Sequence, residues 1–273
     1  GIGEAYAANG ADLFDALEWI DLGEHRGVSE EEGRAIDSVN LSEVTSAASV
    51  DLRDLAAQTV TIGPRTLNLR NTEGIVGTDF DDTLYGVIKA DALGTGSEIL
   101  GGDGDDTIIG GDAVDRLVGQ GDSDWVSGGK GNDILYGGDK DAVEDAASDD
   151  LFGGEGADMF YVGAGDTVHD PDEASERIYW SETDYFTGGV RKKGDPADTY
   201  TAEDGTTYQY ETSGPNVGGL TITRPDGAQY FVQNFVNHEA SIHLLDEPDE
   251  NDPVDAEQYL SPLVLDLGGD EIT

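Results

Sequence analysis

Aspartates recur at every ninth residue through the middle of the chain. Four nine-residue units run without a gap from Gly101 to Tyr136, each with Asp at its sixth position and an aliphatic residue at its eighth. The four aspartates are Asp106, Asp115, Asp124 and Asp133. Carboxylates at a fixed spacing on a glycine-rich backbone suit a hard divalent cation, which takes oxygen ligands. They are better explained as cation ligands than as the acid–base groups of an enzyme.

Among divalent cations, Ca²⁺ fits this pattern best. It takes six to eight oxygens at about 2.3–2.6 Å, and carboxylates and backbone carbonyls of glycine-rich turns can supply them. Mg²⁺ demands a tight octahedron and keeps its waters. Transition metals favour His or Cys, but the repeats have no His before His169 and the chain has no Cys. We therefore expect several Ca²⁺ ions.

Each unit predicts one turn followed by one short strand. The first six residues form the turn, and the last three form a strand with one side chain facing inward. Such strands are too short to be stable alone, so successive coils must stack. If two units make one coil, alternate turns share an edge. One edge then stacks Asp82, Asp106, Asp124 and Asp149, and the other stacks Ser97, Asp115, Asp133 and Asp158.

The acidic charge of these stacks requires a counter-ion. Stacked coils lie about 4.8 Å apart. Two like charges at ~4 Å repel by roughly 1 kcal/mol in water and ~4 kcal/mol at an effective dielectric of 20. Residues 77–161 contain 21 Asp and Glu against four Lys and Arg, and roughly six to eight divalent ions between the turns would neutralise this excess.

The array extends beyond its regular centre. Gly77–Tyr85 and Gly153–Tyr161 keep the same register, whereas the unit that follows Tyr85 is degenerate. The unit that opens at Gly137 carries seven extra residues, and a weak last unit ends at residue 170. The predicted array therefore spans residues 77–170.

The nonapeptide G-G-x-G-x-D-x-U-x resembles the calcium-binding repeat of the RTX (repeats-in-toxin) proteins. The resemblance covers about a third of the chain. It implies an all-β fold, a right-handed parallel β-roll with an N-terminal capping region and a C-terminal antiparallel β cap. The candidate metal ligands are Asp79, Asp82, Gly101, Gly102, Asp103, Gly104, Asp106, Gly110, Gly111, Asp112, Asp115, Gly119, Gly121, Asp122, Asp124, Gly128, Gly129, Gly131, Asp133, Gly137, Gly138, Asp139, Asp149, Gly153, Gly154, Gly156 and Asp158.

Composition excludes several classes of partner. The 59 acidic and 14 basic residues give a net charge of −45, which repels nucleic acid and anionic membranes. No apolar stretch is long enough to cross a bilayer, and without Cys no disulfide forms. No metalloprotease, nucleophile-elbow or phosphate-loop motif is present, so we expect no enzyme activity.

The flanking sequence predicts distinct regions around the array. We expect a helical linker or the end of an upstream domain over 1–40, N-terminal cap strands over 41–76, a C-terminal β cap over 171–245, an acidic linker over 246–259 and the start of a truncated module over 260–273. The helix candidate covers 11–23. Apolar alternation at 50–52, 60–62 and 67–69 predicts the cap strands, and turns at 203–205 and 225–227 predict two hairpins in the C-terminal cap.

The C-terminal cap resembles the region that follows many RTX arrays. We expect its aromatic residues to form a core: Tyr179, Trp180, Tyr208, Tyr210, Phe231 and Phe235. The last residues resemble the start of the FrpC-type self-processing module, in which an Asp before a Pro is the calcium-triggered cleavage site. Here Ser261 precedes Pro262, and Gly268 and Glu271 also depart from that pattern.

These features predict a calcium-binding module of a protein that a type I system secretes. The resemblance implies that the module is disordered at low cytosolic Ca²⁺ and folds in millimolar external Ca²⁺, which drives secretion and stabilises neighbouring domains of a toxin or other exoprotein. Its partners are then calcium and the secretion machinery, through a signal outside this sequence, and we expect a monomer. Two alternatives remain: a segment that cuts its own Asp-Pro bond, for which Asp252-Pro253 is a further candidate, and a surface adhesion module.

Overall fold

The computed structural model describes residues 4–6, 19–21, 38–54, 56–70, 72–88, 95–139, 147–169, 176–211, 218–237 and 239–246. Nearly all of these residues belong to strands or to the turns between them. In the described part of the chain the one helix is the short 3₁₀ turn η1 (Glu239–Ser241), and no helix there is long and apolar enough to cross a membrane.

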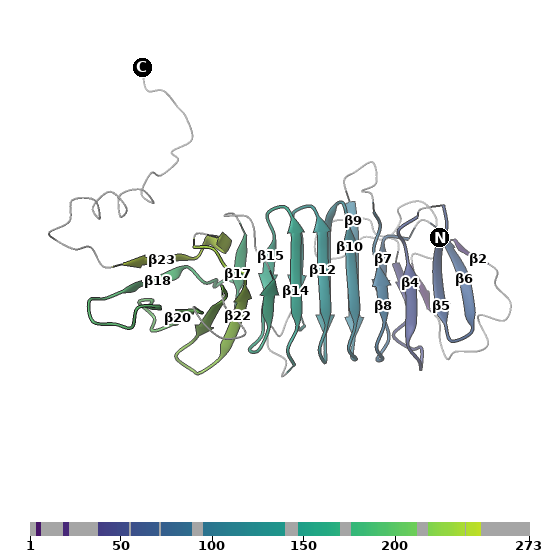
Figure 1. Ribbon diagram of the computed structural model, residues 1–273. Helices are drawn as coiled ribbons and strands as arrows, with labels where there is room; N and C mark the ends of the chain where they lie inside the picture. Colours follow the sequence, from purple (N-terminus) through teal and green to yellow (C-terminus); the bar gives the residue numbers. More distant parts are fainter. Residues whose placement is uncertain are drawn as a thin grey trace, which may run out of the picture.

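The repeats fold into two facing parallel sheets, and the chain alternates between them with each turn (Figure 1). The first sheet contains β7 (Gly74–Val76), β9 (Thr95–Gly102), β11 (Val114–Gln120), β13 (Ile134–Tyr136), β15 (Met159–Tyr161) and β17 (Arg177–Tyr179). The second contains β8 (Thr83–Tyr85), β10 (Thr107–Gly111), β12 (Trp125–Lys130), β14 (Asp150–Glu155) and β16 (Thr167–His169). Each pair of units thus makes one coil of an all-β roll, as the sequence predicted.

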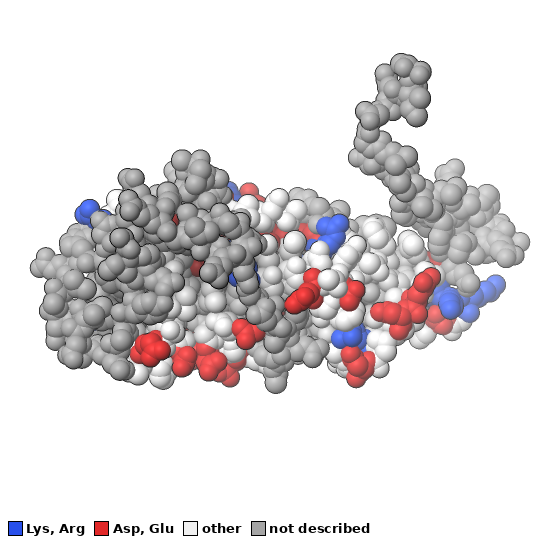
Figure 2. Space-filling model, turned by 180° about the vertical axis from the view of Figure 1, so that it is seen from behind, with Lys and Arg blue, Asp and Glu red and all other residues white. Residues whose placement is uncertain are grey.

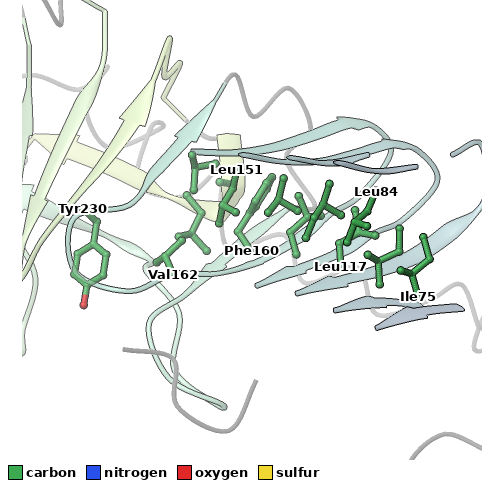
Figure 3. Packing of buried hydrophobic residues seen from close by; sticks show 14 of the residues in the cluster. Ile75, Leu84, Leu117, Leu151, Phe160, Val162 and Tyr230 are labelled. Atoms are coloured by element: carbon green, nitrogen blue, oxygen red, sulfur yellow. The ribbon is translucent and has the colours of Figure 1, made fainter. Parts of the chain in front are cut away.

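One aliphatic or aromatic side chain from each strand fills the space between the sheets. In the second sheet Ile108 lies between Leu84 and Val126, and all three are completely buried. In the first sheet Leu117 lies between Ile99 and Leu135. Figure 3 shows this packing, with Ile75, Leu117 and Phe160 from the first sheet and Leu84 and Leu151 from the second. The eighth position of each unit is therefore the core position, because it is the residue of the short strand that points inward.

The N-terminal strands lengthen both sheets. β4 (Ala48–Asp51) pairs parallel with β8, and β5 (Gln58–Ile62) and β6 (Arg65–Arg70) follow as an antiparallel meander. β3 (Ser38–Asn40) pairs with β7 in the other sheet, and β1 (Glu4–Tyr6) pairs with β3. The strands expected from apolar alternation thus form, and they cover the first coil of the array.

The prediction of a helix over 11–23 is wrong for the part of this segment that the structure describes. Most of that segment lies outside the described residues, but Trp19–Asp21 is strand β2, which pairs parallel with β6. Backbone hydrogen bonds to an existing sheet edge override the local helical periodicity there.

The C-terminal cap continues the second sheet. β22 (Gln229–Gln233) pairs parallel with β16, the last strand of the array. β21 (Leu220–Thr223), β20 (Thr207–Tyr210), β19 (Thr199–Thr201), β18 (Gly188–Arg191) and β23 (His243–Asp246) extend it further. Both predicted hairpins are present, with antiparallel β19–β20 and β21–β22. Residues after 246, including both Asp-Pro and Ser-Pro segments, lie outside the described part.

The cap aromatics divide between core and surface. Tyr208 and Phe235 are fully buried, together with Phe186 and Tyr230, which the sequence did not single out. Tyr179, Trp180, Tyr210 and Phe231 are only partly buried. Tyr179 belongs instead to a stack on the outer face of the first sheet, where the rings of Tyr136, Tyr161 and Tyr179 lie 4.4 and 4.7 Å apart.

Candidate metal centres

The sixth-position aspartates form two hydrogen-bonded ladders, one along each edge of the roll. On the first edge the backbone N–H of each rung donates to Oδ1 of the next aspartate: Asp82 to Asp106 (2.7 Å), Asp106 to Asp124 (2.8 Å), Asp124 to Asp149 (2.8 Å) and Asp149 to Asp166 (3.0 Å). On the second edge the same kind of bond joins Ser97 to Asp115, Asp115 to Asp133 and Asp133 to Asp158. The two stacks are those predicted from alternate units.

The ladders bury their acidic groups almost completely. Asp106 and Asp133 are 2% and 1% exposed. In each, Oδ1 accepts the backbone bond of the ladder, whereas the buried Oδ2 accepts no hydrogen bond. A buried carboxylate oxygen without a donor is costly, so it calls for a proton or a cation.

The same burial raises the pKa values of Asp106 and Asp133. Burial, with a contribution from neighbouring aspartates, raises the pKa of Asp106 from 3.8 to about 7 and that of Asp133 to about 8. Burial also raises the pKa of Asp82, but three hydrogen bonds from Ala48 and Thr78 oppose the shift there. A cation beside the central aspartates would favour the charged form and lower these pKa values.

The first glycine of each turn leaves a space on which oxygens from two coils converge. A Cβ on Gly101 would overlap Oδ2 of Asp106 and the carbonyl oxygen of Gly119, one coil further on. On the other edge, a Cβ on Gly128 would overlap Oδ2 of Asp133 and the carbonyl oxygen of Gly153. Carboxylate and carbonyl oxygens are the ligands Ca²⁺ prefers, so the residues present fit this ion.

Glycines at positions two and four give the turn its shape. Gly102 and Gly104 have φ of 129° and 110°, and Gly129 and Gly131 have φ of 108° and 125°. A residue with a side chain disfavours positive φ, which explains why the motif has glycine at these two positions. The turn 119–124 is an exception, because Gln120 (φ 88°) and Asp122 (φ 64°) adopt positive φ without being glycine.

The other predicted ligands occupy different places. The third- and fourth-position aspartates are exposed at the turn tips: Asp79, Asp103, Asp112, Asp122 and Asp139. Figure 2 shows exposed acidic residues along one margin of the roll. Gly102, Gly111, Gly121 and Gly129 are half-buried between the ladders and these tips. Within the described residues, no three His, Cys, Asp or Glu side chains gather at one point.

Two further buried acidic residues were not among the predicted ligands, one in the weak last unit of the array and one after it. Asp166 and Glu176 are each 1% exposed, and they precede the core residues Val168 and Ile178 by two positions. Asp166 ends the first ladder, where its Oδ1 accepts the N–H of Asp149. The nine-residue spacing hides Asp166 because the turn before it, 162–166, is one residue shorter than the others. The spacing of an acidic residue two positions before an inward aliphatic residue is the signal that could have found them.

The comparison with protein families agrees with this geometry. The family model described as the RTX calcium-binding nonapeptide repeat matches residues 96–126, 109–139 and 145–168. The array is an RTX repeat region. RTX repeats bind several Ca²⁺ ions, and the parallel roll is the fold they imply. The matched repeats thus form a calcium-binding β-roll, and further strands extend its sheets at both ends. No curated protein matches the chain.

Proposed function

We propose that this chain is the calcium-responsive module of a protein exported by a type I secretion system. In this proposal the RTX roll is unfolded at low cytosolic Ca²⁺ and folds outside the cell. The observation that carries it is the pair of buried aspartate ladders, in which Oδ2 of Asp106 and of Asp133 accepts no hydrogen bond. A roll that buries such groups is poorly stable until a cation binds.

The proposed ligands are ladder aspartates whose Oδ2 accepts no hydrogen bond, together with backbone carbonyls of the glycine-rich turns. Asp106 and Gly119 would supply oxygens on one edge, and Asp133 and Gly153 on the other. A bound Ca²⁺ supplies positive charge between successive turns, which offsets the repulsion between carboxylates. The strands themselves contribute little alone, since most array strands have three to seven residues.

The added strands support a role in stabilising neighbouring domains. β4–β6 cover one end of the roll, and β22 attaches the C-terminal cap to the other. Covered ends allow the stack to form without exposing a long sheet edge. We propose that folded neighbours on either side are held in place by this rigid unit. No catalytic role is part of the proposal.

Circular dichroism during a calcium titration tests the proposal. In EDTA the chain should show mostly coil, because the buried carboxylates oppose stacking. Millimolar Ca²⁺ should restore β structure, whereas the same concentration of Mg²⁺ should not, since Mg²⁺ retains its waters. Full β structure in EDTA would refute calcium-coupled folding. Gel electrophoresis of the same samples tests the Asp-Pro alternative, for which cleavage on calcium addition is required.

A further inference from the structure

The six-residue turns of the array have two backbone conformations. In 101–106, 119–124, 128–133 and 153–158, the residues at positions two and four both have positive φ. In 77–82 and 110–115, no residue has positive φ. We call the first kind open turns and the second kind closed turns.

The ladder aspartate has different hydrogen-bond donors in the two kinds of turn. In the closed turns the N–H of position two donates to Oδ2 of the aspartate of the same turn, from Thr78 to Asp82 (2.7 Å) and from Gly111 to Asp115 (2.6 Å). In the open turns this bond is missing at Asp106 and Asp133, whose buried Oδ2 accepts none. The closed turn therefore supplies from its own backbone what the open turn lacks.

Thr78 strengthens the closed turn at the N-terminal end of the array. Its Oγ1 donates to Oδ1 of Asp82 (3.0 Å) and accepts the N–H of Phe80 (3.1 Å). Oδ1 of Asp82 also accepts the N–H of Ala48 (2.6 Å). Both oxygens of Asp82 thus have donors from the protein, and Thr78 is itself buried.

The residue at position four accounts for the difference. Both closed turns have a side chain there, Phe80 and Ala113, whereas three of the four open turns have glycine. A side chain disfavours the positive φ that the open conformation requires. Asp122 fills the position in the fourth open turn, and Asp is among the residues that tolerate positive φ best.

We propose that calcium binding in this array is confined to the open turns, and that Asp82 and Asp115 are positioning residues of the ladder rather than metal ligands. Among the described turns, two pairs of open turns are direct neighbours: 101–106 with 119–124, and 128–133 with 153–158. In each pair a carboxylate oxygen of the first turn, from Asp106 or Asp133, and a carbonyl oxygen of the second turn, from Gly119 or Gly153, converge on one space. These are the two best-formed calcium sites, one on each edge. The inference rests on the proposed calcium-binding role and specifies where it acts.

Two matched pairs of variants in the full chain test this assignment by isothermal calorimetry with CaCl₂. D133N and D115N change equivalent aspartates on one edge. G131A and A113G exchange the position-four residues of the same two turns. D133N and G131A should each bind about one ion fewer than the wild type. D115N should keep the wild-type number of ions, and A113G should gain about one, because glycine allows the turn to open.

An equal loss of bound calcium in D115N and D133N would overturn the assignment. So would an A113G variant that binds the wild-type number of ions, and this variant keeps Asp115 and its ladder bond. Circular dichroism of each variant at saturating Ca²⁺ checks that the roll has formed. A wild type that keeps its β structure in EDTA would contradict calcium-coupled folding alone, because calorimetry still counts the sites.

Discussion

At the scale of single residues, Asp106 and Asp133 have two opposed states. With a cation beside them they are charged ligands, and without one they are buried acids that favour a proton. Burial raises the pKa of Asp106 to about 7 and that of Asp133 to about 8. A carboxyl that binds its proton more tightly in the folded state stabilises that state when protonated, and loses this contribution as the pH rises through the folded pKa.

Acid should therefore stabilise the calcium-free roll. Between the ordinary carboxyl pKa of 3.8 and about 7 to 8, the folded state binds more protons than the unfolded state. The free energy of unfolding in EDTA must then fall as the pH rises through this range. Circular dichroism in EDTA should show more β structure at pH 5 than at pH 8.

The variant Asp106→Asn separates charge from shape in that experiment. It removes a buried charge without changing the size of the side chain, so in EDTA at pH 8 it should stabilise the roll by about 1–3 kcal/mol. It should also flatten the pH dependence and weaken the response to Ca²⁺. β content that rises with pH in EDTA would contradict the upward shift of both pKa values.

At the scale of secondary structure, each strand of the array contributes one inward side chain, so each sheet presents a single column of core residues. Ile108 in β10 is completely buried, whereas its neighbour Thr107 lies on the outer face and is half-buried. Because each sheet supplies only one such column, no further layer of side chains compensates for a truncated one. The core is therefore sensitive to single substitutions in a way that a thicker core is not.

Ile108→Ala should lower the free energy of unfolding of the calcium-loaded roll by about 2–5 kcal/mol. Thr107→Ala should change it by about 0.5 kcal/mol or less, since that side chain contributes little to the core. Chemical denaturation at saturating Ca²⁺ measures both. Equal effects of the two substitutions would show that the inward direction of the eighth position is not what stabilises the coil.

The sequence was informative about elements wherever the signal was periodic. Asp106 and Ile108 recur at fixed offsets in later units, and this periodicity predicted both stacks and the core row. It was not used to predict that 110–115 is a closed turn, although Ala113 stands there in place of the position-four glycine. The effect of that replacement became clear only from the bond between Gly111 and Asp115. The strand β2 was equally hidden, since it forms only where β6 offers an edge.

At the scale of the whole molecule, the roll and the C-terminal cap share one sheet. β22 joins β16 in parallel, and the N–H of Phe231 donates to the carbonyl oxygen of Asp166 (3.0 Å), the last residue of the first ladder. The N–H of Gly165 likewise donates to the carbonyl oxygen of Gln229 (2.8 Å). These two bonds join the last coil of the array to the cap. We therefore expect calcium binding to the array and folding of the cap to be coupled through this junction.

Breaking the junction should make the whole chain harder to fold with calcium. Phe231→Pro removes the N–H that reaches Asp166 and places a proline inside a paired strand. The calcium concentration at the folding midpoint should rise severalfold, as measured by circular dichroism. Phe231→Leu is the matched control, because it shortens the side chain but keeps the N–H. Equal midpoints for the proline and leucine variants would exclude coupling through this bond.

The stacking of coils also fixes how chain length becomes molecular length. Eighteen residues make one coil, as in the pairing of Ile108 with Val126. As an extended chain they span about 60 Å, but stacked they advance the roll by about 4.8 Å. Each coil that forms therefore draws in its chain about twelvefold. Folding of the array is a large linear contraction, and whatever is tied to its ends is pulled together as it occurs.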